Sequence, residues 1–126
     1  MTYQKDLAVL VKVAEKIISK IEIQTEIYPK IRDAVVFCRN WIDDMPVEEE
    51  LIYELLDDED ENDLVGYYVN AENEKDKSKY GIILGVVSCV AVAVLEENKS
   101  TIPQFLSGVD ETYYEAVIRE AGKVEL

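Results

Sequence analysis

The sequence predicts an all-α protein, a compact single-domain bundle of five to six helices over residues 1–126. Apolar residues recur every three or four positions over most of the chain, the spacing of helices that bury one face. Proline and small polar residues stand where these stretches begin, as expected at helix starts. The length suits one domain, and 48% apolar with 32% charged residues is a globular composition.

The first two predicted helices have clear apolar stripes. The first begins near Leu7 and reaches Ile21, with lysines on its opposite side. Pro29 suits the first turn of the second, because the N–H that proline lacks would have no partner there. The first stripe is Leu7, Leu10, Val11, Ala14, Ile17, Ile18 and Ile21, and the second is Ile31, Ala34, Val35, Cys38, Trp41, Ile42 and Met45.

Two shorter helices are predicted around an acidic stretch. Pro46 is expected to open the third helix, with glutamates at 48–50 in its first turn, where the helix dipole favours negative charge. Asp60 or Asn62 is expected to cap the fourth helix. The buried sides are predicted as Leu51, Ile52, Leu55 and Leu56 in the third helix, and Leu64, Val65, Tyr68 and Val69 in the fourth.

A long apolar run predicts a fifth, central helix over about residues 79–97, with Ser78 as its cap and residues 71–79 as an exposed connection. The valines and isoleucines in this run also suit a strand, but an uncharged run from 80 to 95 without a turn signal is long for one strand. The run is also shorter than the ~20 apolar residues of a membrane-spanning helix. Small residues that would let other helices come close are Gly81, Gly85, Ser88, Cys89 and Ala93.

The last predicted helix lies between two glycines. Gly108 breaks the chain, Asp110 is expected to cap the helix, and Gly122 is expected to end it. Its buried side is predicted as Tyr114, Val117, Ile118 and Ala121.

Composition excludes several functional classes. With 27 Asp and Glu against 13 Lys and Arg, the net charge is −14, so phosphate backbones and anionic lipid surfaces are unlikely partners. Histidine is absent, which removes imidazole-based catalysis and the commonest zinc ligand. Cys38 and Cys89 are interpreted as buried, reduced thiols rather than a disulfide or a reactive thiol. The polar opening segment is no signal peptide, and a cytoplasmic protein is expected.

The acidity is concentrated in the middle of the chain. Between Asp43 and Asp63 there are twelve acidic residues and no Lys or Arg. No calcium loop fits, because Asp63 stands where such a loop starting at Asp58 needs glycine. No phosphate-binding loop or distinctive pair of catalytic carboxylates is present either, so no enzyme activity, metal or cofactor is expected.

Two interpretations of the acidic stretch remain, a solvated face and a surface for a basic partner. The second is favoured, because like charges repel along a helix and acids near Asp57 follow a helix end, where the dipole disfavours them. Tyr53 and Tyr67 fall off the apolar stripes and are expected to be exposed, whereas Trp41 and Tyr68 align with core positions. The predicted partner-binding residues are Glu50, Tyr53, Glu54, Asp57, Asp58, Asp60, Asp63 and Tyr67.

Several segments resemble an all-helical immunity-protein family of bacterial polymorphic toxin systems, the sixth in the usual enumeration. They are Cys38-Arg-Asn-Trp-Ile-Asp-Asp, Glu50-Leu-Ile-Tyr-Glu-Leu-Leu-Asp-Asp-Glu-Asp-Glu-Asn-Asp, Ile102-Pro-Gln-Phe-Leu and Val109-Asp-Glu-Thr-Tyr. The resemblance implies a non-enzymatic antitoxin that binds and neutralises a cognate toxin domain. The acidic charge of this chain suggests that the toxin is basic, as expected of a nuclease whose cleft must hold phosphates.

Two other classes stay open at the level of sequence. One is a helical adaptor or regulatory protein acting as a homodimer, in which the acids serve only solubility. The other is a metal-dependent enzyme built on carboxylates, which the lack of histidine makes the least favoured. The oligomeric state and the identity of the toxin are not encoded in any recognisable motif.

Overall fold

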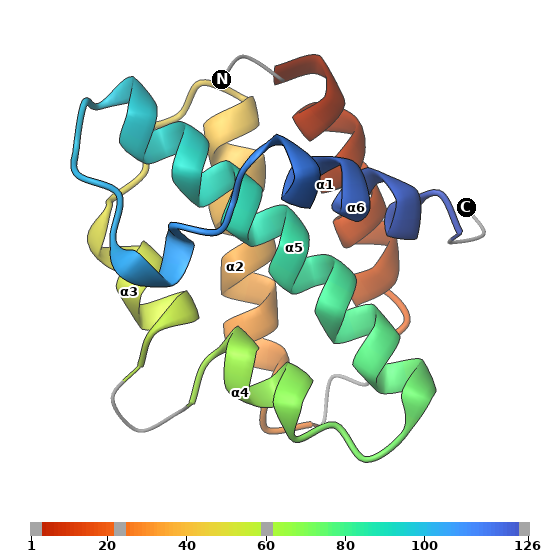
Figure 1. Cartoon of the computed structure of the whole chain (residues 1–126). Helices are drawn as coiled ribbons and strands as arrows, with labels where there is room; N and C mark the ends of the chain where they lie inside the picture. The colour runs from red at the N-terminus through yellow and green to blue at the C-terminus, as the bar shows by residue number, and fades with distance from the viewer. Residues whose placement is uncertain (1–3, 22–24, 59–61, 124–126) are drawn as a thin grey trace.

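The computed structural model describes residues 4–21, 25–58 and 62–123, and these residues form helices and no strand (Figure 1). The predicted all-α bundle of five to six helices is therefore confirmed. The elements are α1 (Gln4–Ile18), α2 (Tyr28–Ile42), α3 (Glu50–Leu56), α4 (Leu64–Val69), α5 (Glu74–Glu97), the 3₁₀ helix η1 (Gln104–Leu106) and α6 (Glu111–Ala121).

The α5 helix is the centre of the bundle, as predicted. It contacts α1, α2, α3, α4 and α6, and every residue from Gly85 to Leu95 is buried. A helix surrounded in this way is apolar on all sides, which explains why its valines also suit a strand. By length and composition α5 could cross a membrane, but 72% of its apolar window is buried inside the bundle.

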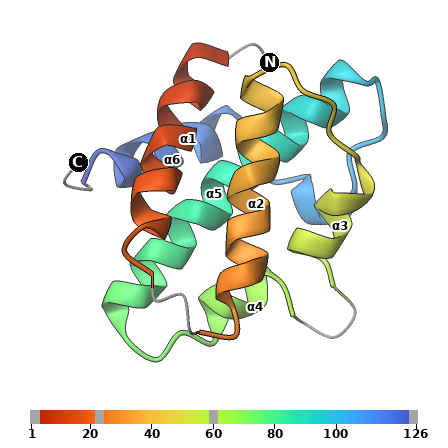
Figure 2. The same ribbon diagram turned by 180° about the vertical axis from the view of Figure 1, so that it is seen from behind.

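The remaining helices lie on two sides of α5. In Figure 1, α1 and α2 lie behind α5 as an antiparallel pair, and in Figure 2 the same pair is in front. The α6 helix packs against both α5 and α1. Between α1 and α2, the Arg39 guanidinium donates through both Nε and Nη2 to the carboxylate of Glu15, with the Nε bond at 3.1 Å.

Three helix starts differ from the prediction or refine it. The α3 helix begins at Glu50 rather than near Pro46, because the fixed φ of proline also suits an extended connection. The cap of α4 is Asp63; Asn62 does not serve, and Asp60 lies outside the described residues. The cap of α5 is Asn73, not Ser78, so residues 74–79 are helical rather than a connection.

The end of the chain follows the prediction more closely. The Asp110 carboxylate accepts a hydrogen bond from the Tyr113 N–H at 2.9 Å and caps α6. The α6 helix ends at Ala121, directly before Gly122. The short η1 helix was not predicted.

Several predicted core residues are exposed. Met45 lies beyond the end of α2, and Ile118 lies on the outer side of α6. Val65 and Val69 are exposed because α4 is short and buries only the side that carries Leu64. The predicted buried sides of these helices therefore include four residues too many.

Both cysteines are free and buried, which confirms the interpretation as reduced core thiols. Burial raises the pKa of Cys89 to about 12. Burial, with Cys89 and Glu15 nearby, also raises the pKa of Cys38 well above its ordinary value. Neither thiol forms a thiolate readily in the folded protein.

Candidate protein-binding site

Four of the predicted site residues share the outer face of α3. Glu50, Tyr53 and Glu54 are spaced by three and one positions, which places them on one side of α3. Asp57 is the C-cap residue directly after the helix, and all four residues are exposed. The opposite side of α3 is buried through Ile52, Leu55 and Leu56. We call the four exposed residues the α3 face.

An aromatic residue from η1 extends the α3 face. The rings of Tyr53 and Phe105 meet edge to face, with centroids 5.6 Å apart and an interplanar angle of 76°. They remain 43% and 36% exposed, respectively. The next residue, Leu106, is buried and anchors η1. Sequence reasoning missed Phe105, because its partner Tyr53 lies some fifty positions earlier and no periodic pattern connects them.

Hydrogen bonds hold the start of α3 against the end of α5. The Glu49 carboxylate accepts from Asn98 Nδ2 at 2.7 Å and from Ser100 Oγ at 2.9 Å. A seven-residue helix has little stability of its own. These contacts and the buried leucines therefore fix the orientation of the α3 face.

The carboxylates of the α3 face have no counterions in the described part of the chain. Glu50, Glu54 and Asp57 form no side-chain hydrogen bond or ion pair there. The last turn of α3 contains no basic residue. The result is a small, exposed, negatively charged surface with an aromatic pair beside it.

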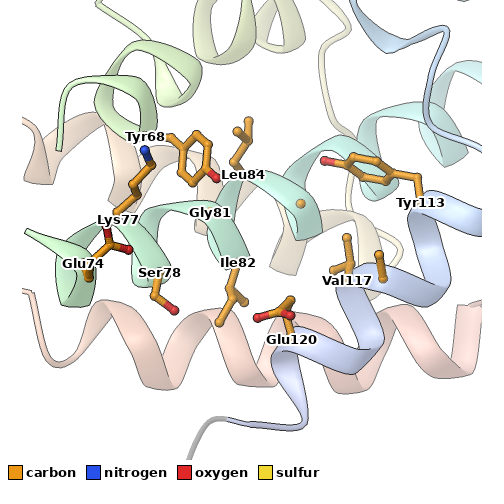
Figure 3. A pocket seen from close by; sticks show the side chains of 12 residues that line it. Tyr68, Glu74, Lys77, Ser78, Gly81, Ile82, Leu84, Tyr113, Val117 and Glu120 are labelled. Carbon is orange, nitrogen blue, oxygen red and sulfur yellow. The ribbon is translucent and has the colours of Figure 1, made fainter.

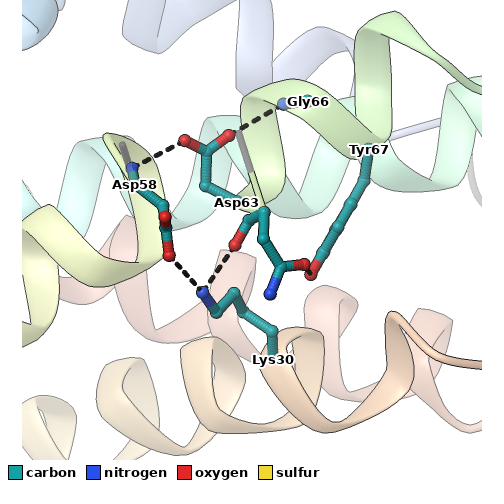
Figure 4. A network of polar contacts seen from close by, with 6 residues as sticks. Lys30, Asp58, Asp63, Gly66 and Tyr67 are labelled. Carbon is teal, nitrogen blue, oxygen red and sulfur yellow. Dashed lines mark hydrogen bonds and ion pairs between the residues drawn. The ribbon is translucent and has the colours of Figure 1, made fainter. Parts of the chain in front are cut away.

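Asp58, Asp63 and Tyr67 have a different place, in a polar network that joins α2 to the connection between α3 and α4 (Figure 4). The Asp63 carboxylate accepts from the N–H groups of Asp58 and Gly66, each at 2.8 Å. We call this network the α3–α4 clasp; it consists of Lys30, Asp58, Asn62, Asp63, Gly66 and Tyr67.

Lys30 and Tyr67 complete the α3–α4 clasp. The Lys30 ammonium donates to Asp58 Oδ2 at 3.1 Å and to the backbone oxygen of Asn62. The Tyr67 hydroxyl donates to the side-chain oxygen of Asn62. Partial burial, with Asp63 and Asp58 nearby, raises the pKa of Tyr67.

The structure thus divides the eight predicted site residues. Four form the α3 face, three belong to the α3–α4 clasp, and Asp60 lies outside the described residues. Asp63 is only 6% exposed, because its carboxylate is enclosed by the N–H groups that donate to it, and its role in partner binding stays a prediction. Within the described residues no three Cys, Asp or Glu side chains gather as a metal ion would require.

Comparison with known proteins gives one match. The family model described as "Immunity protein Imm6" matches residues 5–124, nearly the whole chain. No curated protein and no solved structure matches.

Proposed function

The chain belongs to the Imm6 family of immunity proteins, and from this premise we propose that it neutralises a cognate toxin by binding the toxin domain through the α3 face. An immunity role requires a surface that recognises one protein partner. The observation that carries the proposal is an exposed aromatic pair on a fixed support beside three carboxylates that have no counterion among the described residues.

This combination suits an interface with a basic protein. Aromatic side chains give large contact areas at low entropic cost and often dominate binding energy. Carboxylates around them attract a cationic partner and speed association. The net charge of −14 acts in the same direction over the whole molecule.

The chemistry of the partner follows from this charge. A nuclease domain is basic around its active cleft, because the cleft binds phosphates. We propose that the toxin is such a domain and that the immunity protein blocks it as a binding protein, without catalysis of its own. Its site of action would be the cytoplasm.

The proposal is tested by searching the open reading frames next to the gene for this chain for a toxin domain and expressing that domain. Co-expression of the two proteins should restore growth of cells that make the toxin. Tyr53→Ala and the charge reversals Glu54→Lys and Asp57→Lys should each weaken binding by roughly tenfold or more, measured by calorimetry.

Glu115→Lys and Glu72→Lys serve as matched controls, since both glutamates are exposed and lie outside the α3 face. They should change the affinity by about threefold at most, through the net charge alone. Wild-type rescue with equal affinities for α3-face and control variants would reject the α3 face while leaving the immunity role in place.

A further inference from the structure

A groove between α4, α5 and α6 lies apart from the α3 face (Figure 3). Its volume is about 520 Å³. Two glycines form its floor: a Cβ atom at Gly81 would lie 2.9 Å from the ring of Tyr68, and one at Gly85 would lie 2.7 Å from Val117. Because these positions carry no side chain, α4 and α6 approach α5 closely and the space between them stays open.

The interior of the groove is apolar and aromatic. Ile82, Leu84 and Val117 line it together with the rings of Tyr68 and Tyr113. Burial raises the pKa of the Tyr113 hydroxyl, and its hydrogen bond with Ser88 partly offsets this rise. Such a lining accepts an apolar side chain.

The charged groups of the groove lie at its rim. The Lys77 ammonium sits 5.3 Å from the centre of the Tyr68 ring, which interacts with it as a cation–π partner. Glu74 has no side-chain partner in the described part of the chain, and Glu120 contacts only the exposed Lys123, at 3.0 Å. A surface ion pair of that kind is weak, so both carboxylates can attract a cation from outside.

The α4 helix, which contributes Tyr68 to the groove, also carries an exposed apolar ridge of two valines. Val65 and Val69 lie three positions before and one after Tyr68, and they are 42% and 63% exposed. A small molecule that filled the groove would leave this ridge uncovered. A polypeptide segment is long enough to contact both.

The α3 helix is also small compared with a stable protein–protein interface. A stable interface buries about 800 Å² on each partner, contributed by roughly 20–30 residues a side. The α3 helix has seven residues, of which three are buried. The helices α5 and α6 and the η1 helix lie in front of α1 and α2 in Figure 1 and behind them in Figure 2, so the groove and η1 share one side of the bundle.

We propose that this groove is a second attachment site for the toxin domain, and that it takes an apolar side chain from a segment with a neighbouring Lys or Arg. The apolar side chain enters between Tyr68 and Val117, and the basic residue pairs with Glu74 or Glu120. This inference rests on the proposed function, because the segment belongs to the same toxin.

The test fills the groove without changing its floor. Ala116 lines the groove from α6, and Ala116→Leu places a larger side chain there at almost no cost in helix propensity. Ala8→Leu, on α1 and outside the groove, is the matched control. For the rim, Glu120→Lys is paired with Glu115→Lys on the same helix.

The probe is the same toxin domain, identified among the neighbouring reading frames, and calorimetry measures its binding. Ala116→Leu and Glu120→Lys should weaken binding by roughly tenfold, and both controls should stay within about threefold of wild type. Unchanged affinity for both groove variants, alongside weakened binding by Asp57→Lys, overturns the groove and leaves the proposed function intact. Absence of binding by the wild type overturns both the groove proposal and the proposed function. If Ala116→Leu lowers the melting temperature, the result for Glu120→Lys is the one that tests the groove.

Discussion

Asp63 shows that a carboxylate in an acidic stretch can serve the fold. Its two oxygens accept from the N–H groups of Asp58 and Gly66, so one side chain caps α4 and closes the connection from α3. A buried carboxylate is stable only when hydrogen bonds replace its hydration. Its neighbour in sequence, Asn62, contributes to the same network through its backbone oxygen.

Removal of this carboxylate should destabilise the protein. Asp63→Ala leaves two N–H groups without an acceptor and is expected to lower the free energy of unfolding by about 1–3 kcal/mol. Urea denaturation measures the change. The exposed Asp57→Ala is the control and should stay within about 0.5 kcal/mol of wild type; equal effects of the two substitutions would contradict the assigned role of Asp63.

The two cysteines give a second prediction at this scale. Burial raises the pKa of both thiols, so a thiolate-directed reagent at pH 8 should react slowly with the folded protein and quickly in urea. The raised pKa makes the free energy of unfolding depend on pH. Below the ordinary thiol pKa of about 9 the thiols are protonated in both the folded and the unfolded protein, and above it the unfolded protein loses its thiol protons first. Stability should fall as the pH rises from about 9 towards 12. Rapid labelling of native protein would show that the thiols are accessible.

At the level of residues, the sequence predicted the burial of both cysteines and the exposure of Tyr53, because apolar spacing reports which side of a helix faces the core. It could not separate Asp57 from Asp63. Both are aspartates next to a helix end, and only the tertiary position of the N–H groups decides which one is enclosed. The place of Phe105 beside the α3 face could not be predicted for a related reason, because its partner is distant in sequence.

Two helix ends contain non-glycine residues in the left-handed region. Asp44 after α2 has φ 58° and Lys99 after α5 has φ 57°. The N–H of the residue that follows each of them donates to a carbonyl oxygen of the helix. Met45 N–H donates to Asn40 O at 2.8 Å, and Ser100 N–H donates to Leu95 O at 2.9 Å. This is the Schellman arrangement, in which glycine is the preferred residue.

Lys99→Gly should therefore stabilise the protein. Glycine removes the steric cost of a Cβ atom at positive φ, and part of the gain is offset by the greater freedom of glycine in the unfolded chain. We expect an increase of about 0.5–1 kcal/mol in the free energy of unfolding. Lys99→Ala retains the Cβ atom and should give no such gain; a similar gain for both substitutions would point to the charge of Lys99 instead.

At the level of elements, the sequence predicted all six α-helices, because their apolar stripes and caps agree. The starts of α3 and α5 were less accurate. Pro46 lies in a connection, and Asn73 with Glu74 and Asp76 supplies the cap and the acidic first turn that had been assigned to a loop. The η1 helix is too short to produce a periodic pattern.

For the whole molecule, the α3 face implies a trade between stability and binding. Glu50 and Glu54 are four positions apart on one helix, and like charges at this spacing cost roughly 0.2–0.5 kcal/mol. Glu54→Gln should therefore slightly stabilise the free protein while weakening toxin binding, mainly through slower association. Thermal unfolding and stopped-flow kinetics measure the two effects, and the difference in association rate should shrink with added salt. A variant that is more stable and binds the toxin at the wild-type rate would contradict a binding role for this carboxylate.

The central claim is that the toxin domain binds over α3 and η1. Hydrogen–deuterium exchange of the immunity protein, free and with the toxin domain, tests this most directly. We expect the slowing of amide exchange on binding to be greatest over residues 50–57 and 104–106. Protection confined to α1 and α2, with α3 and η1 exchanging as in the free protein, would contradict it.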